Sequence, residues 1–310
     1  MTLMMIEEMV HAALIESAQD LPAPPWKEMG HGVWGTVYDL GDGSVLKLVR
    51  KRGGLGSAAG LIHRETSVLA ALGGQRVGGF QLPALLGHGD LSLPANPFVA
   101  PLEGWLRLSR LNGKILSASV PTGPDARQRL GEQLGAAIAD FHAATPALSD
   151  AGKIPTTDPI DRAIGLLATA LPKPEDKLLC ERLRVRWHKQ ERPAPVLLHG
   201  DINFSNVLVD DDGGFGLIDF AECGYGPAHA DFRHLESRPE FRDAVFLGYR
   251  VASGAPIDID TYYLAATVNA LATLYFGGTV QPGVTANDPR VGMRLRGMVR
   301  HCADKAGLEE

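Results

Sequence analysis

The first third of the chain is patterned mainly for β-strands. From Val33 to Val49, β-branched and aromatic residues alternate on both sides of Asp42-Gly43. Alternation around a turn-forming pair predicts a β-hairpin. Further strand-like runs occupy residues 80–90 and 97–116. Residues 56–74 have helical spacing instead and end at two glycines, so we expect one helix inserted into a mainly β unit.

From Asp125 onward the pattern becomes helical. Apolar residues recur with helical spacing over residues 125–144, 164–171, 175–189 and 235–310. A loop over residues 146–159 and a β-hairpin over residues 196–220 interrupt this pattern, and the connection to the first part is expected near residues 108–114. We therefore predict an α+β protein with a small β-rich lobe, residues 1–110, and a larger, mainly helical lobe, residues 111–310.

The longest run without charged residues, 261–287, raises the question of a membrane span. A helix is predicted for Tyr262–Phe276, ending at Gly277-Gly278 with Pro282 soon after. Such a helix would be about 22 Å long, too short to cross a bilayer. We expect a buried core helix and no membrane association.

Composition narrows the classes of function. The 310 residues are 45% hydrophobic and 21% charged with a net charge of −6, so no basic footprint for nucleic acid is present. The mild acidic excess is compatible with a cationic small substrate. Cys180, Cys223 and Cys302 are scattered, which argues against a disulfide framework or zinc site and fits a reducing cytosol. Glu7 and Glu8 stand where a signal peptide would be basic, so we expect an N-terminal amphipathic helix in a cytoplasmic protein.

Three glycines form a G-x-G-x-x-G pattern at Gly30, Gly32 and Gly35. A dinucleotide-binding interpretation requires a helix after the pattern, whereas here a strand pair follows. A glycine-rich hairpin above nucleotide phosphates has this layout, including Val37 two positions past the third glycine. A flexible hairpin without a ligand is the alternative, because the chain contains 36 glycines.

Lys47 is flanked by apolar neighbours on the outgoing strand of the predicted hairpin. An inward lysine is costly to bury without an anion, and phosphate oxygens plus a carboxylate would satisfy it. Glu65 on the following predicted helix can supply that carboxylate. The alternative is a surface lysine whose stem covers apolar residues, with an unrelated glutamate.

Within the predicted hairpin at residues 196–220, His199, Asp201, Asn206 and Asp219 interrupt the apolar runs. Phosphoryl transfer needs a group that accepts or orients the proton of the attacking hydroxyl, and oxygen ligands that hold Mg²⁺ against the nucleotide phosphates. A carboxylate and a carboxamide on one loop, with a second carboxylate across a hairpin, provide both. His199 is expected to shape and orient the turn.

The pattern H-G-D-x-x-x-x-N followed by I-D-F resembles the catalytic and metal-binding loops of the aminoglycoside phosphotransferase and choline kinase family. The resemblance runs in order from the glycine-rich hairpin through Lys47, Glu65, the hinge-like residues 106–113 and the segment 224–232, and so spans residues 28–232. It implies a bilobal protein-kinase-like fold, with ATP (GTP remaining open) and Mg²⁺ as cofactors.

The resemblance also implies roles for individual residues. Asp201 would be the catalytic base, with Mg²⁺ held by Asn206 and Asp219. Lys47, paired with Glu65, would hold the α- and β-phosphates. The remaining assignments are the phosphate lid at Gly30, Gly32, Gly35 and Val37, the purine contacts from the backbone of Ser109–Leu111, and Asp231 as a brace for the catalytic loop beside His199. Glu222 is either a neighbour of the metal or a surface residue.

Three other features are interpreted as structural. A second H-G-D at residues 88–90 lacks the carboxamide five positions on, where Ala95 stands, and is expected to be a turn at a strand end. Asp210–Gly214 is similar to the start of a calcium loop, but Ala221 occupies the position that needs a glutamate, so we expect a solvated hairpin turn. His142, near the end of a helix, is expected to be a structural histidine.

The acceptor is expected to be a small molecule with a hydroxyl group: an aminoglycoside, choline, an amino alcohol or a sugar. Only eleven residues separate Asp219 from Asp231, too few for a long peptide-binding loop. A protein Ser/Thr kinase and a non-catalytic pseudokinase remain the alternatives. Four carboxylates of the predicted C-terminal helices either bind an amine of the acceptor or belong to solvated helix faces: Glu236, Glu240, Asp258 and Asp260. Monomer and homodimer both remain open.

Overall fold

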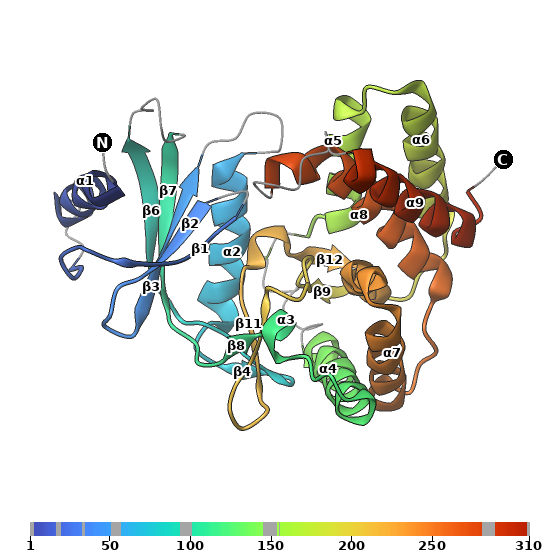
Figure 1. Cartoon of the computed structure of the whole chain (residues 1–310), viewed down its shortest axis with the longest axis horizontal. Coiled ribbons are helices and arrows are strands. Elements are labelled where there is room, and N and C mark those ends of the chain that lie inside the picture. The colour runs from blue at the N-terminus through green and yellow to red at the C-terminus, as the bar shows by residue number, and fades with distance from the viewer. Residues whose placement is uncertain are drawn as a thin grey trace.

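The computed structural model describes residues 3–16, 20–32, 35–50, 57–93, 101–144, 154, 156–280 and 289–308. A β-sheet with one helix on each face forms one side of the molecule, and helices dominate the other side (Figure 1). This is the α+β arrangement predicted from the sequence.

Two five-stranded sheets are present in the described residues, and the one with the longer strands is called the larger sheet. It is antiparallel throughout, with strands in the order β1 (Lys27–His31), β2 (Gly35–Asp39), β3 (Ser44–Arg50), β7 (Leu102–Ser109) and β6 (Leu85–Leu93). The predicted hairpin about Asp42-Gly43 is confirmed as β2 and β3. The second H-G-D lies within β6, not at a strand end, because β6 continues past it to Leu93. Pairing of residues 87–90 with residues 104–107 of β7 thus overrides the turn signal of its glycines, and the register shifts only before Gly87 and after Asp90.

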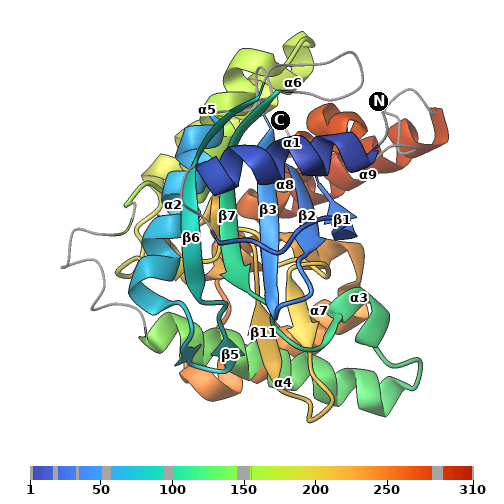
Figure 2. The same ribbon diagram turned by 90° about the vertical axis from the view of Figure 1, so that its left-hand side faces the viewer.

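Side chains of β3 alternate between two environments. Leu46 and Leu48 pack with Leu14 of α1 (Leu3–Glu16), which lies across the outer face of the sheet (Figure 2). Val49 instead packs with Ile62 of α2 (Ala58–Leu72) on the inner face. Since side chains of a strand alternate in direction, Lys47 shares the inner face with α2. The predicted helix at residues 56–74 is confirmed, and Gly73 follows its last residue.

A second sheet joins residues from both parts of the chain. Its order is β4 (Arg76–Val77), β5 (Phe80–Gln81), β11 (Phe215–Leu217), β10 (Val207–Val209) and β8 (Lys114–Ile115). β5 pairs in parallel with β11, and Phe80 packs against Phe141 and Phe215. The segment 76–81 therefore contacts the C-terminal part of the chain, and the lobe boundary at residues 110 and 111 stays a prediction.

The predicted hairpin at residues 196–220 is confirmed only in its second half. β10 and β11 form the hairpin, with Asp210–Gly214 as its turn, in which the Asp210 carboxylate accepts the amide of Gly214 at 2.6 Å. β9 (Val196–Leu198) pairs instead with β12 (Gly224–Gly226). Between β9 and β10 the chain turns at Gly200, where φ is 81°.

The C-terminal part is helical, as predicted. Its helices are α3 (Leu116–Ser119), α4 (Pro124–Ala144), α5 (Pro159–Ala170), α6 (Pro174–Lys189), α7 (Pro239–Ser253), α8 (Ile259–Val280) and α9 (Pro289–Lys305), with the 3₁₀ helices η2 (Phe220–Glu222) and η3 (Ala228–Ser237) between β11 and α7. Most of the loop expected over residues 146–159 lies outside the described residues.

Helix α8 is a core helix, with Leu264, Ala265 and Leu271 fully buried. It continues through Gly277-Gly278 to Val280, so the expected end at these glycines is wrong. A glycine costs about 1 kcal/mol within a helix, which does not by itself end one. In the part of the chain that the structure describes, no helix has both the length and the apolar character needed to cross a membrane.

Candidate active site

A cavity of about 530 Å³ lies between the larger sheet and the β10–β11 hairpin. Its walls come from β1, β2, β3, α2, the segment after β7, and the residues around the hairpin. Most of the predicted nucleotide and metal residues line it: Gly30, Gly32, Val37, Lys47, Glu65, Ser109, Leu111, Asn206 and Asp219. Residues from distant parts of the sequence therefore meet at one cavity.

The glycine pattern forms the turn between β1 and β2. Gly32 N–H donates to the Gly35 carbonyl at 2.9 Å, and residues 33 and 34 lie outside the described residues. A strand on each side of the turn is the hairpin geometry expected from the sequence. Gly35 is not in the cavity wall; a Cβ there would lie 1.9 Å from the Leu48 carbonyl oxygen. Close strand approach explains this glycine.

Lys47 joins the two sides of the cavity. Its Nζ lies 2.6 Å from Glu65 Oε2 and 2.8 Å from Asp219 Oδ1. Burial alone lowers the pKa of Lys47, but the carboxylates of Asp219 and Glu65 outweigh burial and hold the pKa above its usual value. Burial raises the pKa of Glu65, which the ammonium of Lys47 opposes. Lys47 is thus a charged, buried group beside the cavity, and the surface alternative is excluded.

Asp219 and Asn206 supply oxygen atoms to the same cavity. Asp219 has φ 66°, the one positive φ of a non-glycine residue in the described chain. Such a conformation is found most often where a site needs it. The backbone carbonyl of Asn206 accepts the backbone amide of Ile218 at 3.0 Å, which ties the asparagine to the residue before Asp219.

The donor set fits a hard cation such as Mg²⁺. In the described residues no cluster of three or more His, Cys, Asp or Glu side chains suits a metal ion. Mg²⁺ commonly takes one or two protein oxygens and completes its octahedron with waters and phosphate oxygens. A carboxylate at Asp219 and a carboxamide oxygen at Asn206, at the wall of a cavity large enough for a nucleotide, meet that requirement.

Three side chains contact the Asp201 carboxylate, two of them through hydrogen bonds. Oδ1 lies 2.9 Å from Asn203 Nδ2 and 2.9 Å from His234 Nε2, and Oδ2 accepts Asn206 Nδ2 at 2.9 Å. Burial would raise the pKa of Asp201, but the nearby His234, Arg233 and His199 lower it to about 2. Asp201 is therefore a fixed, ionised carboxylate beside one metal-ligand candidate.

The Asp231 carboxylate braces the loop that carries Asp201 by accepting backbone amides of that loop. Its carboxylate is fully buried and accepts the amides of His199 at 2.9 Å and Gly200 at 2.7 Å. Burial would raise the pKa of Asp231, but hydrogen bonding from His142, 3.2 Å away, helps lower it. Tyr249 contacts the other ring nitrogen of His142 at 3.1 Å, so His142 is structural, as expected.

His199 has its two ring nitrogens engaged. Nε2 lies 2.9 Å from the Ile218 carbonyl, and Nδ1 accepts the Asp201 amide at 3.2 Å. This pattern requires a neutral ring with its proton on Nε2. Burial lowers the pKa of His199, in keeping with a neutral ring. His199 thus shapes the turn and has no nitrogen left to act as a base.

Glycine is required at position 200 for two reasons. Its φ is 81°, and a Cβ would lie 2.1 Å from the carbonyl oxygen of Glu222. The side chain of Glu222 pairs with Arg162 of α5 at 3.3 Å, and Arg162 also donates to the Glu222 carbonyl at 2.7 Å. Glu222 therefore holds η2 against α5, a role that differs from both sequence-based interpretations.

The far end of the cavity has the apolar walls that a purine requires, from Val45, Leu108, Leu208 and Ile218 among others. Of the predicted backbone donors, the amide of Ser109 bonds to the Ala84 carbonyl at 2.9 Å and that of Arg110 to the Gly43 carbonyl at 2.9 Å. Leu111 is the member of this segment whose amide has no backbone partner within the described residues. Of the three amides in this predicted contact segment, that of Leu111 therefore remains as the donor for a purine.

Sequence reasoning missed His234 and the apolar cavity wall. His234 lies three residues after Asp231, and no spacing rule connects it with Asp201, 33 positions earlier. The apolar wall residues look like ordinary strand residues in sequence. Only the approach of β3, β7 and the β10–β11 hairpin shows which of them face the cavity.

The four carboxylates named as candidates for binding an amine differ in exposure: the side chains of Glu240 and Asp260 are 79% and 60% exposed, whereas Glu236 is buried. Glu236 is buried and bonds to Arg242 at 2.6 Å and to His301 at 3.0 Å. Glu240 lies 2.8 Å from Arg127, and Asp260 lies 3.6 Å from Arg186. Asp258 accepts the Thr261 amide at 3.0 Å at the start of α8.

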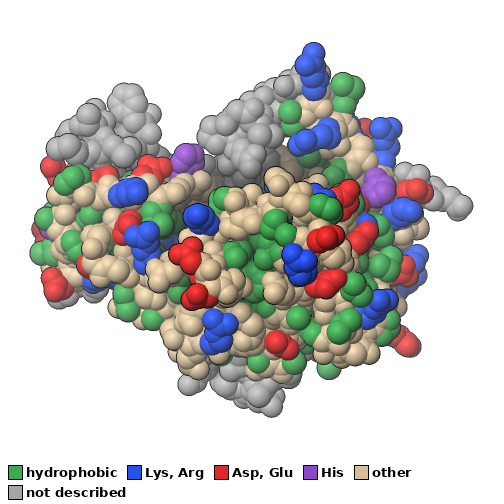
Figure 3. All heavy atoms as spheres, turned by 60° about the horizontal axis from the view of Figure 1, so that its bottom comes forward, with side chains coloured by type: hydrophobic (Ala, Val, Ile, Leu, Met, Phe, Trp, Pro, Cys, Tyr) green, Lys and Arg blue, Asp and Glu red, His purple; other side chains and the backbone are tan. Residues whose placement is uncertain are grey.

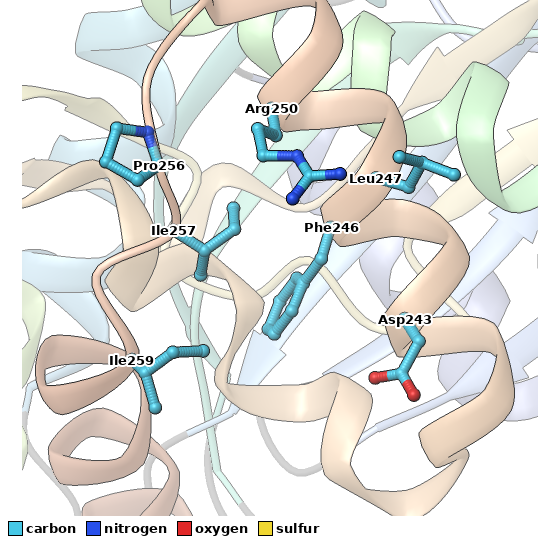
Figure 4. A pocket seen from close by; sticks show the side chains of 7 residues that line it. All are labelled: Asp243, Phe246, Leu247, Arg250, Pro256, Ile257 and Ile259. Atoms are coloured by element: carbon cyan, nitrogen blue, oxygen red, sulfur yellow. The ribbon is translucent and has the colours of Figure 1, made fainter.

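A second, smaller cavity of about 390 Å³ lies between α7 and the segment before α8 (Figure 4). Phe246, Leu247, Ile257 and Ile259 form apolar walls, and it contains none of the predicted site residues. On the molecular face of Figure 3, acidic and basic side chains are interspersed. Because the predicted residues line the larger cavity and not the smaller one, the candidate active site is the larger cavity together with the Asp201 loop.

Comparison with known proteins identifies the family and the fold. Residues 26–263 match the model of the phosphotransferase enzyme family. The fold is similar to that of aminoglycoside 2'-phosphotransferase-IIIa in its GDP complex, with a TM-score of 0.64 and 19% identity over 97% of this chain and 99% of that one. No curated protein sequence matches the chain.

Two further solved structures share the fold. Amicoumacin kinase hAmiN, in complex with AMP-PNP, Ca²⁺ and Ami, has a TM-score of 0.61 and 16% identity over 95% of this chain and 93% of that one. A choline/ethanolamine kinase family protein from Mesorhizobium loti has a TM-score of 0.57 and 16% identity over 96% and 94%. The kinase-like fold expected from the sequence is confirmed.

Proposed function

The chain belongs to the phosphotransferase enzyme family, and from that premise we propose that it transfers the γ-phosphate of ATP to a hydroxyl group of a small molecule. One observation carries the proposal. The Asp201 carboxylate is bonded to Asn206, which lines the same cavity as Lys47 and Asp219. Base, metal ligands and phosphate-binding lysine thus form one connected site.

The roles follow from the chemistry of each group. Lys47 offers a buried ammonium to the α- and β-phosphates, and Glu65 keeps it in place. Asn206 and Asp219 would hold Mg²⁺, which when bound neutralises charge on the phosphates. Asp201 accepts the proton of the acceptor hydroxyl as the oxygen attacks the γ-phosphorus, while the β–γ bridging bond breaks and ADP leaves.

The chain between the metal ligand and the brace favours a small acceptor. Residues 220–237 are occupied by η2, β12 and η3, so no long extended loop follows Asp219 as in protein kinases. A protein substrate would lack its usual docking strand there. Glu236 is buried and paired, while Glu240 and Asp260 stay exposed, so these carboxylates do not decide between an amine-rich and a neutral acceptor. Neutral sugars and other polyols therefore belong in any substrate survey.

The proposal allows either adenine or guanine as the purine of the nucleotide. The neighbours that contain GDP and AMP-PNP show that this fold accommodates guanine and adenine nucleotides. In this chain the apolar walls and the Leu111 amide are compatible with both, because neither feature distinguishes the two purine rings. We propose ATP as the donor, with GTP as the comparison.

The test is an ADP-release assay with ATP and GTP against aminoglycosides, choline, amino alcohols, sugars and a protein substrate such as casein. We expect turnover with at least one small hydroxyl compound and none with casein. Asp201→Asn should lower turnover by about 10²–10⁴-fold and leave Mg-nucleotide binding nearly unchanged. Turnover that persists in this variant, or occurs with protein alone, would contradict the proposal.

A further inference from the structure

His234 contacts the catalytic carboxylate although nothing in the H-G-D pattern includes it. Its Nε2 lies 2.9 Å from Asp201 Oδ1, an ion-pair distance, and this buried nitrogen has no partner in hydrogen-bond geometry among the described residues. His234 belongs to η3, which also carries the brace Asp231. Two functional contacts of one short helix therefore converge on adjacent residues of one loop.

The geometry of η3 explains this convergence. In a 3₁₀ helix, residues three apart lie directly above one another. Asp231 and His234 are three apart, so they project from the same side of η3. Asp231 accepts the amides of His199 and Gly200, and His234 reaches the side chain of the next residue, Asp201. In an α-helix the two side chains would be rotated relative to each other.

The contacts assign different tasks to the two oxygens of Asp201. A carboxylate oxygen offers two lone-pair sites. Oδ1 accepts from Asn203 Nδ2 and lies at ion-pair distance from His234 Nε2, whereas among the described residues Oδ2 accepts from Asn206 alone. The amide orientation of Asn203 is fixed, because its oxygen accepts the Ser205 amide at 2.7 Å. Oδ2 therefore keeps the free site that an acceptor hydroxyl requires.

We propose that His234 is a positioning residue for the phosphotransfer reaction: its imidazole, paired through Nε2 with Oδ1 of Asp201, holds that oxygen, so that Oδ2 faces the acceptor hydroxyl. The inference rests on the proposed function, in which Asp201 is the base. Nε2 must carry the proton, since a bare nitrogen would repel the carboxylate at this distance. His234 itself neither contacts the nucleotide cavity nor takes the substrate proton.

The kinetic test compares three variants. His234→Ala should lower kcat by about 100-fold, the effect of misplacing a reacting group by about 1 Å, with the KM for nucleotide unchanged. His234→Gln places an amide nitrogen where Nε2 stands and should recover kcat to within about tenfold of the native enzyme. His234→Asn is the matched control, since its nitrogen corresponds to Nδ1 and cannot reach Oδ1.

Melting temperatures and nucleotide affinity of the three variants show whether each is folded. Equal kcat for His234→Ala and the native enzyme would overturn the proposal, as would equal losses in the Gln and Asn variants. If the native enzyme turns over no hydroxyl compound, the proposed function fails, and the contact itself is tested by NMR. A slowly exchanging Nε2–H signal of His234 should be present in the native protein and lost in Asp201→Ala; its absence from both would exclude the hydrogen bond.

Discussion

Lys47 Nζ lies 2.8 Å from Asp219 Oδ1, although the two residues are 172 positions apart in the sequence. The same ammonium lies 2.6 Å from Glu65, so one cation links β3, α2 and the end of the β10–β11 hairpin. The two carboxylates differ in exposure: the Glu65 side chain is 2% exposed and that of Asp219 is 41% exposed. Asp219 can therefore turn toward a metal and nucleotide while Glu65 keeps the lysine in place.

Removing the Lys47 ammonium should lower the free energy of unfolding. Lys47→Met leaves Glu65 buried without its partner, which should cost about 3–5 kcal/mol of unfolding free energy. Glu65→Gln in the same chain should recover much of that loss, because a neutral amide is cheaper to bury than an unpaired charge. Urea unfolding of the two single variants and the double variant gives the coupling. Additive effects would contradict the pairing, and all three variants should bind Mg-ATP weakly.

Asp219 should determine the metal requirement. Asp219→Asn removes the carboxylate that would ligate Mg²⁺, and we expect the Mg²⁺ concentration for half-maximal turnover to rise by about 10–100-fold. The measurement is a Mg²⁺ titration of the ADP-release assay at saturating nucleotide. Asp212→Asn in the exposed hairpin turn is the control, since it removes the same charge away from the cavity. A similar shift in both variants would mean that Asp219 acts only through net charge.

Gly200 and Gly213 offer a matched pair, because φ is 81° at each. A Cβ at Gly213 meets nothing within 4 Å, whereas one at Gly200 would lie 2.1 Å from the Glu222 carbonyl oxygen. Gly213→Ala should cost about 1–2 kcal/mol for the backbone conformation alone. Gly200→Ala should cost about 2–5 kcal/mol, since displacement of η2 adds to that strain. Thermal unfolding measures both, and equal losses would show that the close approach is unimportant.

Acid should destabilise the protein through His229. Burial lowers the pKa of His229 from 6.5 to about 4, with the nearby Asp258 opposing the shift. Between these values the unfolded chain binds more protons than the folded one, so stability is full above about pH 6.5 and is lost as pH falls toward about 4, by up to about 1.4 kcal/mol per pH unit.

The matched variant for this prediction is His229→Asn. Asparagine keeps an acceptor near the Asp258 amide, which His229 Nδ1 contacts at 3.3 Å, but it does not titrate. Urea unfolding between pH 4 and 7 should give a shallower pH dependence for this variant than for the native chain. Because burial also lowers the pKa of His199, some pH dependence should remain. Identical slopes in the two proteins would show that His229 does not contribute.

The sequence by itself determined the class of chemistry and most of the local structure. The sequence could name the candidate base and metal ligands, Asp201, Asn206 and Asp219, because they lie on a short loop and a hairpin. Such local structure brings them close together whatever the rest of the fold does. The β2–β3 hairpin and α2 followed from alternation, helical period and turn residues, which act over a few neighbouring positions.

Tertiary structure decided what depends on contacts between distant segments. No local signal shows that β9 pairs with β12, that Lys47 meets Asp219, or that His234 reaches Asp201. The same holds for the pairing of Glu236 with Arg242, which removed it from the residues available to an amine. The physical reason is that a side chain's partner is set by packing of whole elements, whereas the sequence pattern encodes only the direction in which that side chain points.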